Sequence, residues 1–594
     1  ERTAGLNFLT EMENNSFAKL IMANTDATHL PALVFSTPNW ILEVDQTKQF
    51  NAAAGGNADP TGGILLTPLV IRDNPNTVGS DTNYLQYTGP DHVVLGGTSG
   101  SDVLVSSEGD DTVYGDDGDD RIEGGYGNDE LRGGAGDDII TDLGGDDNIQ
   151  GGDGNDVIQG GNGVNLIIGG FGSDFIITGE DASEAIGGHG NDFILGSKAN
   201  EQDMGNEGDD WIEKGTSDGA PGDNFDPLGN DPIIGNDVFI GDGENDKFNA
   251  EGGDDIMVGK TGFGDRYIGG SGYDWASFKG DPAGVHIDIS DRFFDTPAVP
   301  GGTQPLARFD IVEGLSGSAM ADVLNGDNED AASLPNAGAQ GSVLTNIALI
   351  DGLQTLLDTA YDADLAPGAH KTFYDGGNII LGGAGSDFIE GRGGDDIIDG
   401  DKWLNVRIRI NDANGVAIGT ADGMAKNVTM FDTNSPLHGK QLSALMVEGR
   451  INPTQLSIVR EILDSSADPL GSAVAGHAGD FDTAIYQGSI SEYTFFEADG
   501  VTVIPVAALA GRGDGVLIVD GKIAGVDDAA TLIRRNPTVP VDHYPGHLVM
   551  AGFVDCHMHY PQTGIVGAYG SGLLDWLEAH TFPAEEAFTD EAVC

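Results

Sequence analysis

The chain has 594 residues, with 97 acidic and 27 basic side chains and a formal net charge of −70 at neutral pH. A compact state carrying that charge repels itself unless cations neutralise it, which disfavours nucleic acid and anionic membranes as partners and favours bound metal ions. The acids are dispersed in a chain that is 39% hydrophobic, which disfavours disorder and leaves a solvated acidic surface as the plain alternative.

Cysteine content and hydropathy further limit the classes of protein to which the chain could belong. The only cysteines are Cys556 and Cys594, so no disulfide framework holds the fold. The sequence has no run of 18 or more apolar residues and no recognisable amino-terminal signal peptide. It starts at Glu1 without a methionine, and we expect a fragment at both ends. A large extracellular protein without disulfides needs another source of stability, and bound metal ions are the obvious candidate.

The chain opens with a segment in which the sequence offers no functional site. Residues 2–21 read as an amphipathic helix, so residues 1–45 are expected to be the helical end of a preceding domain. His29 is expected to be a loop or packing residue rather than a metal ligand. Residues 46–90 are expected to form linker strands.

A nonapeptide repeat begins at Gly97 with the pattern G-G-x-G-x-D-x-U-x, in which U is aliphatic. The sixth position holds the key aspartates Asp102, Asp111, Asp120, Asp129, Asp138, Asp147, Asp156, Asp174 and Asp192. Only Asn165 and Ser183 interrupt these aspartates, and the phase is kept through both. The aliphatic positions are Leu104, Val113, Ile122, Leu131, Ile140, Ile149, Ile158, Ile167, Ile176, Ala185 and Ile194.

The chemistry of calcium explains this spacing. Glycine reaches positive φ without a Cβ penalty, so the glycine-rich half of each unit can turn sharply and aim carbonyl groups inward. The aspartate adds a carboxylate, and neighbouring turns together can supply the six to eight oxygens that calcium takes. The x-U-x half forms a short strand whose aliphatic side chain fills the interior, so stability comes from stacking. We predict that the array is largely unfolded in chelator and folds when calcium is added.

The repeat resembles that of RTX proteins, which form a calcium-binding parallel β-roll. The predicted fold class is therefore mainly β, a parallel β-roll over residues 91–280 with helical insertions. The spacing is interrupted by an insertion from Gly215 to about Asn236, and beyond residue 264 it runs one residue out of phase. The further key aspartates of this roll are Asp210, Asp246, Asp255 and Asp274.

Two less regular regions lie on either side of a second, short block of repeats. That block covers residues 371–402, with Asp387 and Asp396 as its key aspartates. Residues 281–370 before it are expected to be an irregular insertion with one helix over Val343–Tyr361. Residues 403–500 after it read as a β-rich tail with one helix around Pro453–Leu463, and no catalytic constellation is visible there.

Other readings of the glycine-rich region are weaker. No G-x-x-x-x-G-K-[ST] phosphate loop exists, and the G-x-G matches are by-products of the repeat. His189 occupies a variable repeat position and is expected to face solvent.

The character of the sequence changes after about residue 506. G-V-L-I-V-D-G-K-I-A-G-V-D-D predicts a hairpin turning at Asp520-Gly521, and it leads to A-G-F-V-D-C-H-M-H-Y-P-Q. Side chains at i and i+2 of a strand point the same way, so His557 and His559 can grip one metal ion from a strand end. Imidazole suits zinc or iron. The plain alternative is that the two histidines merely cap a strand.

Two family resemblances extend these inferences. Three segments resemble bacterial animal-type haem peroxidases that carry RTX repeats. They are R-T-A-G-L-N-F-L, F-I-E-G-R-G-G-D-D-I-I-D-G-D-K-W-L-N-V and E-G-R-I-N-P-T-Q-L-S-I-V-R-E-I-L. That resemblance covers residues 1 to about 500 and implies a haem domain upstream of Glu1. Residues 506–594 resemble the amino-terminal part of guanine deaminase, an amidohydrolase. This implies an incomplete β-sandwich and barrel start, His557 and His559 as first metal ligands, and Gln562 as a purine contact.

The predicted function is calcium binding in the carboxyl-terminal region of a secreted haem-peroxidase-like protein. The alternatives are a metal-dependent guanine deaminase, incomplete in this chain, and a structural or adhesive calcium-binding protein. About 250 residues make such a barrel, and only 35 follow His559, so neither active site is expected to be complete. Because RTX proteins are exported and guanine deaminases are intracellular, we expect two joined reading frames with a seam between about Phe495 and Gly515.

Overall fold

The computed structural model describes residues 83–89, 92–197, 202–213, 235–241, 246–260, 265–291, 307–334, 341–361, 368–465 and 482–485, and shorter stretches elsewhere, mostly strands near both ends. The chain divides into two compact units, residues 1–487 and 488–594. Within the described residues, no helix is long and apolar enough to cross a membrane.

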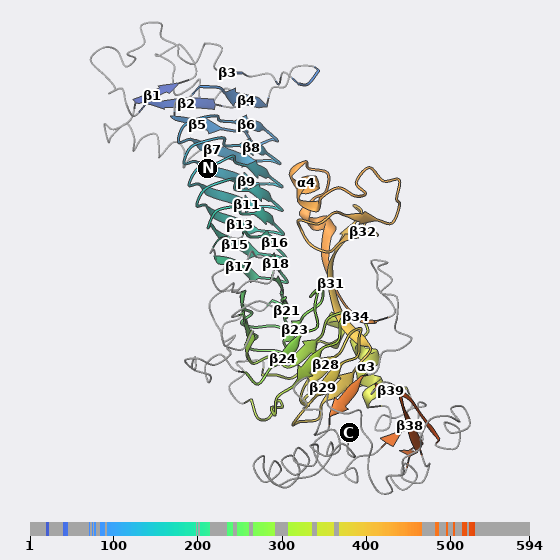
Figure 1. Cartoon of the computed structure of the whole chain (residues 1–594). Coiled ribbons are helices and arrows are strands. Elements are labelled where there is room, and N and C mark those ends of the chain that lie inside the picture. The colour runs from blue at the N-terminus through green and yellow to red at the C-terminus, as the bar shows by residue number, and fades with distance from the viewer. Residues whose placement is uncertain are drawn as a thin grey trace, which may run out of the picture. The chain divides into compact units, whose positions relative to one another are not determined.

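The nonapeptide repeats of the first unit wind into a parallel β-roll, as the sequence predicts (Figure 1). Each turn takes two repeats, because strands pair in parallel with the strand eighteen residues further on, as Ile122 does with Ile140. One wall is a nine-stranded sheet in which the antiparallel strands β1 (Lys19–Met22) and β2 (Trp40–Asp45) lead into parallel strands. Those are β5 (His92–Gly96), β7 (Thr112–Asp117), β9 (Glu130–Ala135), β11 (Asn148–Asp153), β13 (Leu166–Phe171), β15 (Glu184–His189) and β17 (Gln202–Glu207).

The opposite wall is a fifteen-stranded sheet that continues much further along the chain. It begins with β3 (Val70–Ile71) and β4 (Tyr84–Tyr87), followed by β6 (Val103–Val105), β8 (Arg121–Glu123), β10 (Ile139–Thr141), β12 (Val157–Gln159), β14 (Phe175–Ile177), β16 (Phe193–Leu195) and β18 (Trp211–Glu213). It continues with β19 (Val238–Ile240), β21 (Ile256–Val258), β23 (Trp275–Ser277), β26 (Gly314–Ser316), β28 (Ile379–Leu381) and β30 (Ile397–Asp399). The two blocks of repeats that the sequence separates, residues 91–280 and 371–402, thus belong to one continuous roll.

Residues 281–370 also contribute strands to the roll instead of forming only an insertion. Beyond β17, the first wall is replaced by two smaller parallel sheets. One contains β20 (Lys247–Asn249), β22 (Asp265–Ile268) and β25 (Ala307–Asp310), and the other β24 (His286–Asp288), β27 (Val323–Asn325), β29 (Phe388–Glu390) and β35 (Thr483–Ile485). The sequence pattern does not reveal these strands, because their glycine turns are irregular.

The interior of the roll is a column of aliphatic side chains, one from each repeat. All eleven aliphatic positions named from the sequence, Leu104 through Ile194, are fully buried and lie in one hydrophobic cluster. A single nonapeptide could bury almost nothing alone, so each turn is stabilised by its neighbours.

A β-arm covers part of the outer face of the fifteen-stranded sheet. The arm comprises β31 (Lys402–Asn411), β32 (Ala417–Ala421), β33 (Thr429–Met430), α4 (Leu442–Val447), η4 (Pro453–Gln455) and β34 (Leu456–Asp464). Its apolar side chains share a cluster with an outward stripe of the roll, formed by Val157, Phe175, Phe193, Trp211, Val238, Ile256 and Trp275. Large apolar side chains on the outside of a roll need such a cover.

Polar contacts fix the arm to the roll at its edges. The Glu213 carboxylate is fully buried and accepts hydrogen bonds from Trp211 Nε1 at 2.8 Å and from the Met424 amide at 2.5 Å. Asn452 Nδ2 donates to Asp137 Oδ2 at 2.8 Å. Burial raises the pKa of Glu213, which the two donors and nearby lysines partly offset.

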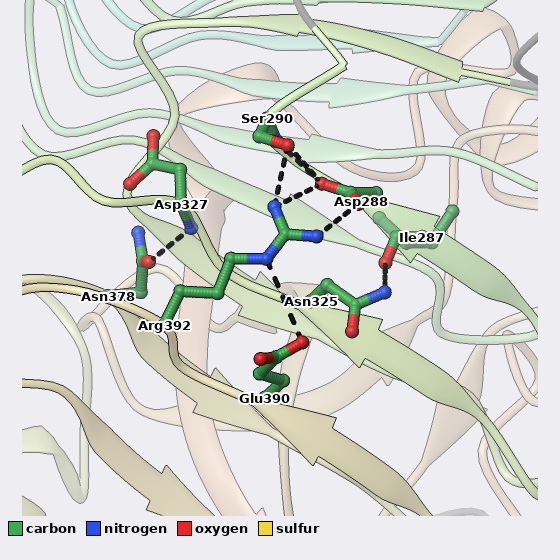
Figure 2. A network of polar contacts seen from close by, with 8 residues as sticks. All are labelled: Ile287, Asp288, Ser290, Asn325, Asp327, Asn378, Glu390 and Arg392. Carbon is green, nitrogen blue, oxygen red and sulfur yellow. Dashed lines mark hydrogen bonds and ion pairs between the residues drawn. The ribbon is translucent and has the colours of Figure 1, made fainter. Parts of the chain in front are cut away.

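A second polar network joins the last strands of the roll (Figure 2). Arg392 Nη1 donates to Asp288 Oδ1 at 2.8 Å and to Ser290 Oγ at 2.6 Å, and Nη2 donates to Asp288 Oδ2. This bidentate pair links the loop after β29 to β24, about a hundred residues earlier. The adjacent turns are tied by the Asp327 amide, which donates to Asn378 Oδ1 at 2.8 Å.

Two helix predictions need correction. Residues around Pro453–Leu463 form only the single 3₁₀ turn η4 before β34, because the segment pairs antiparallel with β31 over nine residues. The helix expected over residues 2–21 is contradicted at its end, where β1 is a strand paired with β2.

Two other local predictions agree with the structure. The helix expected within Val343–Tyr361 is present as η3 (Ile347–Leu349) and α3 (Leu353–Ala360). In the second unit, β38 (Asp514–Val519) and β39 (Lys522–Asp528) form the predicted hairpin, in which Val519 pairs with Lys522 across the two-residue turn.

Candidate metal centre

The key aspartates form a continuous ladder along the turns that precede the fifteen-stranded sheet. In each turn the amide of one aspartate donates to Oδ1 of the corresponding aspartate in the next turn, at 2.6–3.0 Å. We call these residues the long row: Asp102, Asp120, Asp138, Asp156, Asp174, Asp192, Asp210, Asp237, Asp255 and Asp274. The ladder ends where the Asp274 amide donates to Glu313 Oε2 at 2.9 Å.

In eight of these ten aspartates, all but Asp237 and Asp255, the second carboxylate oxygen points into the turn beside the first glycine of its repeat. A methyl group placed on Gly151 would lie 2.2 Å from Asp156 Oδ2 and 2.6 Å from the Gly169 carbonyl oxygen. The same point beside Gly169 lies 2.3 Å from Asp174 Oδ2 and 2.6 Å from the Gly187 oxygen. In these turns a carboxylate oxygen and a carbonyl oxygen of the next turn therefore gather beside the same glycine, where any side chain would displace them. Both are oxygen ligands of the type that calcium takes.

These inward oxygens lack hydrogen-bond donors. Oδ2 of Asp120, Asp156, Asp174 and Asp192 is buried and has no hydrogen-bond partner among the described residues. A buried carboxylate oxygen without a donor is costly, so its placement calls for a cation. The donor set, carboxylates with backbone carbonyls, is of the hard oxygen type that suits calcium.

The pKa values of the long-row carboxyls also favour a bound cation. Burial, together with the neighbouring Asp174 carboxylate, raises the pKa of Asp156 to about 9. Burial likewise raises the pKa of Asp120 and of Asp174 to about 7. Without a counter-charge, the row would be partly protonated near neutral pH, whereas a bound divalent cation would hold the carboxylates ionised.

A second, shorter row precedes the nine-stranded sheet. Its amide-to-carboxylate ladder contains Asp111, Asp129 and Asp147, which we call the short row. Beyond Asp147 the ladder continues through uncharged side chains. The Asp147 amide donates to Asn165 Oδ1 at 2.9 Å, and the Asn165 amide donates to Ser183 Oγ at 3.1 Å. The two interruptions of the sequence pattern therefore lie in adjacent turns of one row.

Asn165 fills its own turn. Its Nδ2 donates to the Gly160 carbonyl at 2.9 Å and lies 3.0 Å from the point where a Gly160 methyl would sit. The amide nitrogen thus lies where the aspartates of other turns have Oδ2, and it donates a hydrogen bond instead of offering a carboxylate oxygen.

The remaining sequence-predicted aspartates lie in shorter ladders. The Asp246 amide donates to Asp265 Oδ1 at 3.0 Å. The Asp322 amide donates to Asp387 Oδ1 at 2.8 Å, and the Asn378 amide donates to Asp396 Oδ1 at 2.8 Å. His557, His559 and Gln562 lie outside the described residues.

Sequence reasoning missed several members of these ladders. Asp237 follows directly on the 215–236 insertion and continues the long row, with its Oδ1 accepting from the Asp210 amide at 2.8 Å. Asp322 follows an irregular G-S-A-M-A-D turn, in which only the first glycine, the aspartate and the aliphatic residue two places later keep the repeat. Asp142 occupies the first position of its repeat, where glycine is usual, and its carboxylate accepts from the Gly125 amide at 2.9 Å.

Comparison with protein families agrees with this geometry. The family model of the RTX calcium-binding nonapeptide repeat matches residues 96–131, 114–141, 123–157, 141–176, 168–200, 234–264 and 374–402. The chain carries calcium-binding RTX repeats. No solved structure matches the chain.

The curated relatives each match a short part of the chain. The chain is 44% identical over 79 residues to guanine deaminase of Escherichia coli, which covers 13% of this chain and 18% of the relative. It is 39% identical over 91 residues to a probable guanine deaminase of Deinococcus radiodurans, covering 14% and 21%. A 5-methylthioadenosine/S-adenosylhomocysteine deaminase of Nitratidesulfovibrio vulgaris is 34% identical over 96 residues, covering 16% and 20%. The chain therefore spans about a fifth of the length of these relatives.

Proposed function

We propose that calcium ions bound along the long row hold the roll folded, in a secreted protein. The observation that carries this proposal is that a buried aspartate Oδ2 without a hydrogen-bond donor, as in Asp156 and Asp174, lies beside a carbonyl of the next turn in successive turns. The key aspartates of both rows, with Asp387 and Asp396, would supply the carboxylate ligands. The ions would neutralise carboxylates that otherwise face one another across adjacent turns.

Calcium-dependent folding tests this proposal. Far-ultraviolet circular dichroism of the full chain in chelator should show little β-structure, and calcium should restore it, whereas an equal concentration of magnesium should not. Magnesium is the matched control because it demands a smaller octahedral site and keeps its waters. A β-signal that is the same in chelator and in calcium would refute the proposal.

A second candidate function concerns the carboxyl-terminal unit. We propose that residues 506–594 are the amino-terminal part of a guanine-deaminase-like amidohydrolase, supported by the 44% identity over 79 residues. His557 and His559 would hold zinc or iron, and Gln562 would contact the purine. Sequencing of the source gene downstream of Cys594, followed by an assay of the encoded protein for ammonia release from guanine, tests this. A frame that does not continue into further metal ligands would rule it out.

The haem-peroxidase relationship of residues 1 to about 500 stays a prediction. It requires an upstream domain with haem ligands. Reading the gene upstream of Glu1 decides whether such a domain is encoded.

A further inference from the structure

Two adjacent turns of the short row bring three carboxylates together. Single oxygen atoms of Asp129, Asp142 and Asp147 all lie within 4.8 Å of one another. Each of the three side chains is only 3% exposed. Asp129 and Asp147 are key aspartates of adjacent turns, whereas Asp142 stands where the repeat has glycine.

Asp142 changes the donor set of this turn. A methyl group placed on Gly124 would lie 2.3 Å from Asp142 Oδ1 and 2.9 Å from Asp129 Oδ2. Beside Gly151, the corresponding oxygens are one carboxylate and one carbonyl. The carboxylate of Asp142 thus replaces the carbonyl of the next turn, and the same point is faced by two negative groups.

The rest of the described chain offers these carboxyls little compensation. Oδ2 of Asp129, of Asp142 and of Asp147 is buried and accepts no hydrogen bond from a backbone or basic donor there. The Asp142 carboxyl hydrogen-bonds to Asp129 and Asp147 only while one of the carboxyls holds a proton. No ion pair joins any of the three to a basic side chain within the part of the chain that the structure describes; Arg132, on the strand after Asp129, pairs with Glu130 at 2.6 Å. Burial raises the pKa of Asp142 to about 8 and that of Asp129 to about 7, as expected for carboxyls without a counter-charge.

We propose that Asp129, Asp142 and Asp147 form a cation site distinct from those of the long row, with three carboxylate ligands and the tightest calcium binding in the roll. It rests on the proposed calcium binding by the repeats. Calcium affinity is tuned by the number of charged ligands and by the rigidity of the site. The next turn of this row is closed by the Asn165 amide, so the three-carboxylate site lies at the end of the charged part of the short row.

Asp142→Gly is the decisive variant, because it restores the glycine that the repeat carries at this position. Asp153→Gly is its matched control: it removes the same charge from an exposed position, and the preceding repeat already has Gly144 at the equivalent place. Calcium bound per full-length chain is measured by equilibrium dialysis at buffered free calcium concentrations, and folding of each variant is checked by circular dichroism in saturating calcium.

We expect Asp142→Gly to lose one ion from the tightest class, or to bind it about tenfold more weakly, because one of three charged ligands is gone. Asp153→Gly should match the unmodified chain. If Asp142→Gly keeps the same tight class, the three-carboxylate site is refuted while calcium binding by the repeats stands. If the unmodified chain binds no calcium, the proposed function fails. Should Asp142→Gly not fold, Asp142→Asn is measured in the same way and carries the same expectation.

Discussion

Gly151→Ala gives the sharpest test of where the ions lie. The φ angle of Gly151 is outside the left-handed region, so alanine is tolerated by the backbone itself. The added methyl carbon would lie 2.2 Å from Asp156 Oδ2. A carbon needs at least 3.0 Å from that oxygen, so the oxygen must move by about 0.8 Å, the difference between these distances. The methyl would crowd both the Asp156 carboxylate and the Gly169 carbonyl oxygen, which are the oxygens expected to bind the ion.

The expected loss is one ion and its share of the stability. At free calcium a hundredfold above the dissociation constant, one ligand stabilises the folded state by about 2.7 kcal/mol. The variant should therefore lose about that much calcium-dependent stabilisation locally, in addition to about 1–3 kcal/mol of overpacking that is present with and without calcium. The difference between the two conditions isolates the effect of the ion.

Amide hydrogen exchange is the suitable assay, because a repeat structure opens locally rather than as one unit. Exchange of the turns containing Asp138, Asp156 and Asp174 is compared in high and low calcium. Gly100→Ala is the control, since its methyl would meet nothing closer than Thr98 Oγ1 at 3.9 Å and its φ is also ordinary. If Gly151→Ala keeps the full calcium-dependent protection, the ion does not bind beside Gly151, and the placement of all the long-row sites is wrong.

Three further predictions test other parts of the structure. In chelator, the stability of residual roll structure should fall as the pH rises from about 4 to about 9. Burial raises the pKa of Asp120 to about 7 and of Asp156 to about 9, so the folded state holds protons that the unfolded state releases. Urea titrations at several pH values measure this stability, and a stability that rises with pH would contradict the prediction. Asn165→Asp should add one bound calcium ion per chain, counted by dialysis, because it replaces the amide that fills the turn beside Gly160; an unchanged count would contradict the assignment. Glu213→Ala should destabilise the arm by roughly 1–3 kcal/mol for each buried donor left unsatisfied, measured as faster proteolysis of residues 402–465, with Glu213→Gln as the milder control.

The roll itself could be predicted from the sequence because its signals are local. Each repeat carries its own turn glycines, its aspartate and its aliphatic residue, so the eleven buried positions and the ladder of aspartates follow from a single period of nine. The eighteen-residue turn then places alternate repeats in different rows. This explains why Asn165 and Ser183, which look like two separate interruptions, share one row.

The remaining features depend on contacts that are distant in sequence. The seventh repeat position is Arg121 early in the roll but Val157, Phe175 and Trp211 further on, and these apolar side chains are the signal in the sequence that the outer face is covered. The identity of the cover could not be predicted, because the arm begins only at Lys402, 191 residues after Trp211. Its β34 strand was predicted as a helix because its pairing partner is β31, about fifty residues away.

The third carboxylate shows how a single departure from a repeat carries information. Asp142 looks like a lapse in the glycine pattern when the sequence is read alone. Its meaning depends on which residues of neighbouring turns face it, and the structure places Asp129 and Asp147 there.

The eighteen-residue turn also determines how much the chain shortens when the roll folds. A fully extended stretch of 18 residues reaches about 60 Å, whereas stacked strands advance by only about 4.8 Å per turn. Each turn that closes around its ion therefore takes up about twelve times its own height in chain contour. Folding of the roll in a calcium-rich medium would shorten the distance between the segments before and after it. The calcium concentration outside a cell would therefore set the distance between these segments.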